Sequence, residues 1–242
     1  MVTTSSALTA PTRIAQLARS SIGAKAVMAV SGLLLVGFVF MHMLGNLQVF
    51  LGAEAMNRYA AFLKESAGEL LWFARAGLLA AVVAHIVSAM RLVRLNRSAR
   101  PVGYAYRDDV QVDFAARVMP MTGLIVLAFI IYHLAHFTIG TVDPELYGLH
   151  DAQGRHDVYS MVVLSFKNPW ISGWYVFANL LLCSHLSHGL QSSFQSLGIN
   201  NRIYTPTIRA IGPVLAAVLF IGFASVPVAC LMGWVEPVGV AP

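Results

Sequence analysis

The chain has 242 residues, of which 57% are hydrophobic and only 11% are charged, and its mean hydropathy is +0.69. A water-soluble domain carries about 25% charged residues, so this composition excludes a protein that is exposed to water on all sides. The net charge of +5 does not indicate a nucleic-acid partner, because the basic residues lie in short connectors between apolar runs. The composition is that of a membrane protein.

Five apolar segments are each long enough to cross the membrane hydrocarbon, which takes about 20 residues. We expect helices over residues 25–50, 70–95, 117–141, 169–195 and 208–234. The first segment is too long for the core of a signal peptide, so we expect it in the mature protein. The predicted fold is all-α, a bundle of five transmembrane helices in one membrane domain over residues 1–242. We find no internal repeat of 20–50 residues.

Two cysteines, Cys183 and Cys230, lie within apolar runs and indicate neither a disulfide framework nor a cysteine metal site. Most of the 16 basic residues lie in alternate connectors, so the positive-inside rule predicts a cytoplasmic N-terminus and, after five spans, an external C-terminus. Residues 96–116 are then a cytoplasmic connector. Residues 142–168 are predicted to form an exposed outer loop that carries His150 and His156 on its surface.

Six of the eight histidines fall within the expected spans: His42, His85, His133, His136, His185 and His188. Ionisable residues at membrane depth are costly, and they usually face the bundle interior with a partner. A single such histidine is as readily a satisfied core residue as a ligand. Six of them in the first four helices favour a bound group.

The helical rise of about 1.5 Å per residue gives the depth of each histidine. His42 and His133 lie near the outer ends of helices that run outward, and His85 and His185 lie near the inner ends of helices that run inward. The four form two layers separated by about 16 Å. Two imidazoles at one depth on different helices are what a six-coordinate b-type haem requires, and two such layers would carry electrons across the membrane.

Two small polar residues support the inner layer. Ser31 precedes His42, and Thr122 precedes His133, by about three helical turns, so each shares the face of its histidine. We expect them to make room for the edge of an inner macrocycle and to donate hydrogen bonds to it. Close packing of helices through small residues is the alternative interpretation.

Spacing alone does not decide which member of each histidine pair is the ligand, because His136 follows His133, and His188 follows His185, by three residues. The spare histidines would bond a haem propionate, line a quinone pocket or face solvent. Arg91, one turn and a half beyond His85, is placed either to neutralise a propionate or to anchor the helix in the headgroups.

Several short motifs occur in order along the chain: His42-Met-Leu-Gly-Asn46, Gly52-Ala-Glu-Ala-Met-Asn57, Thr122-Gly123 before His133, and His185-Leu-Ser-His-Gly189. With these residues the chain resembles the dihaem cytochrome b membrane-anchor subunit of succinate dehydrogenase and fumarate reductase, in the class with a single five-helix anchor. The resemblance runs through all five segments and depends on the order and spacing of the motifs.

The resemblance implies iron ligands at His42 and His133 for an outer haem and at His85 and His185 for an inner haem, with His136 and His188 as extra residues. It implies a flavoprotein subunit and an iron–sulfur subunit on the cytoplasmic face of a bacterial inner membrane. Electrons would pass from succinate through these partners and both haems to a membrane quinone, with menaquinone expected. The chain would then serve the respiratory chain and the tricarboxylic acid cycle without itself binding succinate, and a higher oligomer of the complex is compatible with this role.

The quinone site is left open among five polar residues near the outer layer: Asn46, Gln48, Glu54, Glu65 and His136. The segment Leu181–His185 carries no acid, so a proton route through the fourth helix is not expected. Three other functions stay open: a stand-alone transmembrane cytochrome b, an anchor without haem, and a transporter that uses its histidines for metal ions or protons.

Overall fold

The computed structural model describes residues 20–99, 114–199 and 201–238. Helices account for nearly all of the regular structure within these ranges, and one isolated bridge joins His150 to His156. The all-α class predicted from the sequence is therefore confirmed. The predicted connector at 96–116 falls largely outside the described residues.

Five helices are long: α2 (Ser21–Asn46), α4 (Gly68–Ser98), α5 (Phe114–His133), α8 (Pro169–Ser196) and α9 (Thr205–Leu231). Four segments are long and apolar enough to cross a membrane, namely Ser21–Leu51, Gly68–Ser98, Val118–Ile139 and Thr205–Leu231. These four agree with the predicted spans to within a few residues. The fourth predicted span coincides with α8, which is helical over 28 residues but falls outside this apolar set.

Local sequence explains where the long helices begin. The Ser20 hydroxyl accepts a hydrogen bond from the Gly23 N–H at 3.0 Å, which satisfies one free donor at the start of α2. Asn168 caps α8 in the same manner, and Pro169 occupies the first helical position, where its missing N–H costs nothing.

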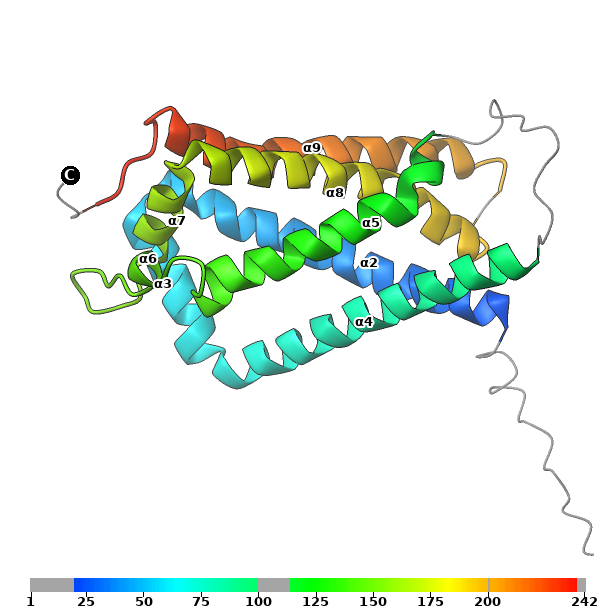
Figure 1. Ribbon diagram of the computed structural model, residues 1–242, viewed down its shortest axis with the longest axis horizontal. Helices are drawn as coiled ribbons and strands as arrows, with labels where there is room; N and C mark the ends of the chain where they lie inside the picture. The colour runs from blue at the N-terminus through cyan, green and yellow to red at the C-terminus, as the bar shows by residue number, and fades with distance from the viewer. Residues whose placement is uncertain (1–19, 100–113, 200, 239–242) are drawn as a thin grey trace, which may run out of the picture.

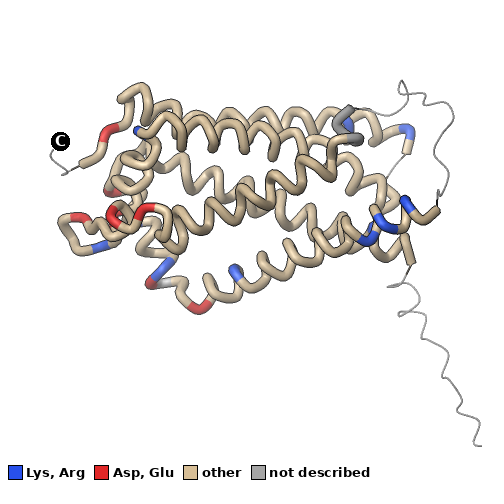
Figure 2. Tube along the Cα trace, viewed as in Figure 1, with Lys and Arg blue, Asp and Glu red and all other residues tan. Residues whose placement is uncertain are grey.

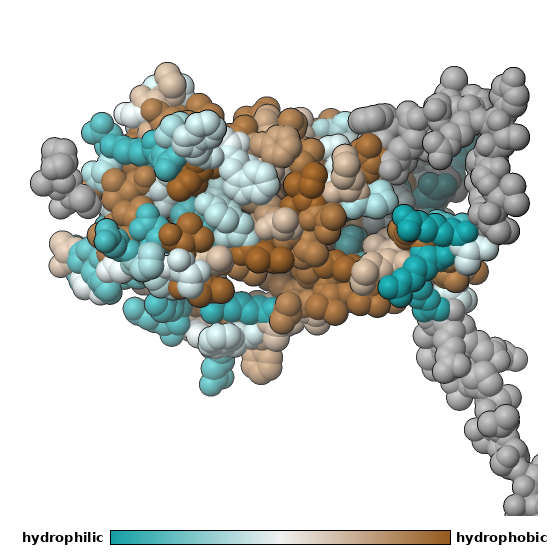
Figure 3. All heavy atoms as spheres, viewed as in Figure 1, coloured by the Kyte–Doolittle hydropathy of each residue, from teal (hydrophilic) through white to brown (hydrophobic). Residues whose placement is uncertain are grey.

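The long helices pack side by side (Figure 1). Helix α2 packs against α4, α8 and α9, and α8 packs against α9, α2 and α5. Helix α4 thus packs on α2, and helix α5 packs on α8. On the face that Figure 3 shows, apolar residues are concentrated in the middle of the bundle and hydrophilic residues lie toward both ends, as expected of a protein surrounded by lipid.

Short helices form a cap at one end of the bundle: η1 (Leu47–Leu51), α3 (Ala53–Ala61), η2 (Phe62–Ser66), η3 (Leu134–Ile139), α6 (Pro144–Tyr147) and α7 (Val158–Phe166). The prediction of an exposed loop at 142–168 is correct for His150, which is exposed, but wrong for α7, whose residues are mostly buried. His156 is also half-buried, and its Nε2 donates to the Tyr147 carbonyl at 2.8 Å. The segment folds back onto the bundle because the apolar side chains of α7 pack into the hydrophobic core.

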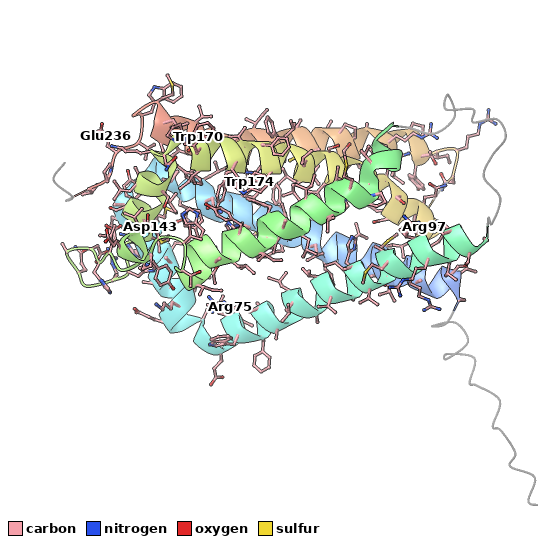
Figure 4. All side chains as sticks on the ribbon, in the orientation of Figure 1. Arg75, Arg97, Asp143, Trp170, Trp174 and Glu236 are labelled. Atoms are coloured by element: carbon pink, nitrogen blue, oxygen red, sulfur yellow. The ribbon has the colours of Figure 1, made fainter. Side chains whose placement is uncertain are left out.

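Charged residues distinguish the two ends of the bundle. Figure 2 shows the acidic residues at the capped end and a group of basic residues at the opposite end. Figure 4 places Asp143 and Glu236 with Trp170 at the capped end and Arg97 at the other. Indole rings favour the membrane–water interface, so Trp170, which is 86% exposed, marks one boundary of the apolar band.

Asn57 of α3 links α3 to the start of α7 within the cap. Its side chain, 1% exposed, donates to Asp157 Oδ1 at 2.9 Å and accepts from the Tyr159 N–H at 2.9 Å. Arg155 and Glu54 add an ion pair at the surface, at 2.6 Å. The hydrogen bond from Arg155 lowers the pKa of Glu54. The ion pair is therefore intact at pH values above the ordinary pKa of a glutamate, and it is lost as the pH falls through the lowered pKa.

Substituting Asn57→Ala is expected to lower the free energy of unfolding by about 2–4 kcal/mol, because a buried carboxylate and a buried N–H both lose a partner. Thermal unfolding of the purified protein in detergent measures the change. Glu54→Gln is the control, since surface ion pairs contribute little, and its Tm should stay near that of the wild type. Equal loss of Tm in the two variants would show that the buried bonds of Asn57 are not what holds the cap.

Candidate functional site

The outer histidines come together from two helices. His42 lies near the end of α2 and His133 is the last residue of α5, and their ring centroids are 5.7 Å apart with an angle of 83° between the planes. Phe38 stacks on His42 with a centroid distance of 5.4 Å. The two imidazoles therefore face each other across the gap between α2 and α5.

The inner histidines form a second pair of the same kind. His85 of α4 and His185 of α8 have ring centroids 6.4 Å apart and an angle of 68° between the planes. His85 contacts Ser31 of α2, which is eleven residues from His42, so the rise of the helix separates the two pairs by about 16 Å. This spacing is the one predicted from the sequence.

Backbone and hydroxyl groups orient the inner rings through Nδ1. His85 Nδ1 lies 3.2 Å from the Met28 carbonyl, and because a carbonyl only accepts, Nδ1 carries the proton. The Thr122 hydroxyl donates to the Met119 carbonyl at 3.0 Å and so accepts from His185 Nδ1 at 3.2 Å. Both contacts leave the Nε2 lone pair free for a metal ion, which is the usual arrangement around metal-binding histidines.

Glycines let these rings approach the neighbouring helix. A Cβ atom on Gly32 would lie 3.2 Å from His85 Cε1, and one on Gly123 would lie 3.4 Å from His185 Cε1. Each glycine directly follows the residue whose hydroxyl faces the same ring, Ser31 or Thr122. Ser31-Gly32 on α2 and Thr122-Gly123 on α5 thus each form the contact surface for a histidine ring of another helix, and we call each of these two-residue surfaces a seat.

The two seats belong to an internal repeat. The sequence Val27-Met-Ala-Val-Ser-Gly32 resembles Val118-Met-Pro-Met-Thr-Gly123, and in both a phenylalanine and then a histidine follow at the same spacing, which are Phe38 and His42 in one copy and Phe129 and His133 in the other. The repeat unit is a helix pair, α2 with α4 and α5 with α8. It is longer than the 20–50 residues of common repeats, so a search at that period does not find it.

The donor set fits a haem with two axial histidines. Imidazole binds a metal ion at about 2 Å, so two imidazoles on opposite sides of one ion have ring centroids about 6 Å apart. Both measured separations lie close to that value. All four rings are also partly exposed, although they lie within the bundle, so each ring has an accessible surface.

No cluster of three or more His, Cys, Asp or Glu side chains suited to a metal ion occurs among the residues that the structure describes. A haem iron does not need one, because the porphyrin supplies four nitrogens and the protein supplies only the axial pair. The cysteines are both buried and free, as expected of small core residues.

The remaining candidates occupy varied positions. Ser31 and Thr122 are buried and lie within hydrogen-bond distance of the inner imidazoles, and their contact with a macrocycle edge stays a prediction. His136 is buried in η3, whereas His188 is partly exposed on α8. Arg91 lies toward the C-terminal end of α4, and both of its predicted roles stay open.

Two of the candidate quinone residues already have partners. The Asn46 amide donates to the His42 carbonyl at 2.8 Å, and Glu54 pairs with Arg155. Glu65 is exposed on η2 and Gln48 is partly exposed on η1.

Sequence reasoning did not single out Tyr175 of α8, whose hydroxyl lies 3.4 Å from His133 Nδ1. Tyr175 is far from His133 in sequence and shares no periodic pattern with it. The seat glycines, in contrast, have a sequence signal, since both follow a hydroxyl residue at a fixed distance from a histidine.

Comparison with known proteins returned no match: no family model, no curated protein and no solved structure matches the chain.

Gly32→Val fills the space beside His85 and is expected to displace the ring. On the prediction of two haems per chain from the sequence, the variant should retain about one. A pyridine haemochrome assay on the purified protein measures this ratio. Gly37→Val is the matched control on the same helix, because a Cβ at Gly37 meets no atom within 4 Å. Full haem content in the Gly32 variant would mean that the close approach of ring and backbone is not required.

Proposed function

We propose that the chain is the membrane-anchor cytochrome b subunit of a succinate:quinone oxidoreductase, a multi-pass protein of the bacterial cytoplasmic membrane. The observation that carries this proposal is the pair of facing imidazoles that recurs at two depths of the bundle. Two b-type haems, when bound, supply one-electron transfer between the two sides of the membrane.

Four histidines hold the cofactors in this proposal, His42 with His133 and His85 with His185. Two axial imidazoles leave an iron without an open position, which favours electron transfer over oxygen chemistry. Ser31, Thr122 and the Met28 carbonyl keep the protons on Nδ1 and so keep Nε2 available.

We propose α8 as the fifth membrane span. It is long enough, since 28 residues extend about 42 Å as a helix. It also packs between α9 and α5, both of which contain candidate spans. Its lower apolarity has a physical reason, because polar residues such as Ser172 and Asn179 are buried inside the bundle rather than exposed to lipid.

The charge distribution supports an orientation with the basic end in the cytoplasm. Arg94 and Arg97 of α4 lie at that end, opposite the acidic cap, and positive residues stay on the cytoplasmic side of a membrane. The N-terminus is then cytoplasmic and the C-terminus external. The inner imidazole pair lies nearer the cytoplasm and the outer pair lies beside the cap.

The partners are those that the family resemblance implies, a flavoprotein subunit that handles succinate and fumarate and an iron–sulfur subunit docked at the basic end. The sequence carries no nucleotide, flavin or iron–sulfur motif of its own, which is compatible with such a division of labour. A membrane quinone, with menaquinone expected, reacts near the outer pair. Among the candidate residues there, Gln48 is partly exposed and Glu65 is exposed, whereas Glu54 is exposed but paired with Arg155. Glu65 is suited to exchange protons with the quinone.

A pyridine haemochrome assay is expected to give about two b-type haems per chain. His42→Ala and His185→Ala should each retain about one, because each removes an axial ligand from a different pair. His150→Ala, in the exposed part of the cap, should retain both. A wild-type protein without haem would contradict the proposal and leave an anchor without haem or a transporter.

Purification through an affinity tag on this chain is expected to recover two soluble subunits, one with covalent or tightly bound flavin and one with iron–sulfur clusters. The complex should reduce a quinone analogue with succinate, while the isolated chain should not. A single chain that carries both haems and passes electrons without these partners would instead identify a stand-alone cytochrome b.

A further inference from the structure

Tyr175 lies between two histidines of the outer layer. Its hydroxyl is 3.4 Å from His133 Nδ1 and 3.0 Å from His136 Nδ1. Both Tyr175 and His136 are almost fully buried, at 4% and 2% exposed. The phenol therefore joins a proposed iron ligand to a histidine that has no place in the ligand pairs.

The chemistry of the three groups fixes the direction of the hydrogen bonds. An iron ligand at His133 Nε2 leaves the proton on Nδ1, which then donates to the Tyr175 oxygen. The Tyr175 hydroxyl is left to donate to His136 Nδ1, and the His136 proton stays on Nε2. A phenol without the second histidine would be free to turn its proton toward His133.

The surroundings strengthen this chain of bonds. The rings of Phe129, Phe137 and Phe166 pack around Tyr175 at centroid distances of 5.1, 5.7 and 5.0 Å. Hydrogen bonds in such apolar surroundings are stronger than in water, and neighbouring bonds polarise one another. The widened turn η3 begins directly after His133 and carries His136, and π-helical turns are frequent at functional sites.

His136 Nε2 is buried and has no hydrogen-bond partner within the described part of the chain. Unsatisfied buried polar atoms are rare, and each calls for an explanation. The direction of the hydrogen bonds explains this atom, because His136 Nδ1 accepts from the Tyr175 hydroxyl and the ring proton is then left on Nε2.

We propose that Tyr175 is a positioning residue for the outer haem ligand His133, and that His136 holds the Tyr175 hydroxyl in the orientation that this role requires. The proposal rests on the proposed function, since it assigns how one of the haem ligands is tuned. A hydrogen bond that Nδ1–H donates makes the imidazole a more basic ligand, which stabilises the oxidised iron. The pair therefore lowers the reduction potential of the outer haem.

Redox titration of the Tyr175→Phe protein, followed optically and by electron paramagnetic resonance, tests this role. The phenylalanine keeps the ring packing and removes only the hydroxyl. We expect the variant to keep about two haems per chain. The oxidised form of the outer haem should lose about tenfold in relative stability, so its reduction potential should rise by about 59 mV for one electron. Its low-spin signal should also change. The outer component is the one that His42→Ala removes.

Three variants separate positioning from packing. Tyr132→Phe is the matched control, because Tyr132 also stacks beside His136 and Tyr175, and it should leave the potential unchanged. His136→Phe removes the acceptor and should shift the outer haem in the same direction as Tyr175→Phe. His136→Gln restores an acceptor and should return the potential toward that of the wild type.

An outer potential and a low-spin signal that move no more in Tyr175→Phe than in Tyr132→Phe would overturn the proposal. Selective loss of the outer haem with the inner haem retained would support it, because the fold is then intact. A wild-type chain that binds no haem at all overturns the proposed function instead, and that result is separate from any comparison among these variants.

Discussion

A histidine inside an apolar helix bundle needs hydrogen-bond partners or a ligand for its two ring nitrogens. This constraint determines how the histidine-bearing helices contact one another. At the inner layer the solution is the same twice. One nitrogen of His85 or His185 is taken by a hydroxyl or carbonyl on the neighbouring helix, and a glycine beside that group lets the ring come close. The other nitrogen, Nε2, keeps its lone pair. A ring held in this way is oriented before any metal ion arrives, so little freedom is lost on binding.

The internal repeat explains why there are two layers and why they are separated as they are. Each copy contributes one helix with an outer histidine and, three turns earlier, a seat for the histidine of its companion helix. The distance from seat to histidine is the same in both copies, because the rise of an α-helix is fixed. Two copies that face each other therefore produce two pairs at matched depths. Histidine pairing is a consequence of helix geometry here, and it needs no specific loop conformation.

This regularity is the part of the molecule that the sequence could predict. The apolar runs predicted the long helices, and the helical rise placed His42 beside His133 and His85 beside His185. What escaped prediction lies off the helical periodicity. The burial of α7 depends on contacts with α3 and α9 that are remote in sequence. The contact of Tyr175 with His133 joins the two helices of the second repeat unit, α8 and α5, across 42 residues of sequence. The sequence placed Ser31 on the correct helix face and at the correct depth. It could not predict that the Ser31 hydroxyl contacts His85, because face and depth do not specify which neighbouring group a hydroxyl contacts.

The packing also suggests what a bound cofactor contributes to assembly. Along their described lengths, α2 is not closely packed against α5, nor α4 against α8, yet these are the helices that each histidine pair connects. The two copies of the repeat meet mainly through α2 and α8. Under the proposed function, a haem held by each histidine pair would link helix surfaces that are not closely packed against each other in the protein alone. Its binding free energy would add to the stability of the folded bundle, so haem loading and helix assembly would be one coupled process.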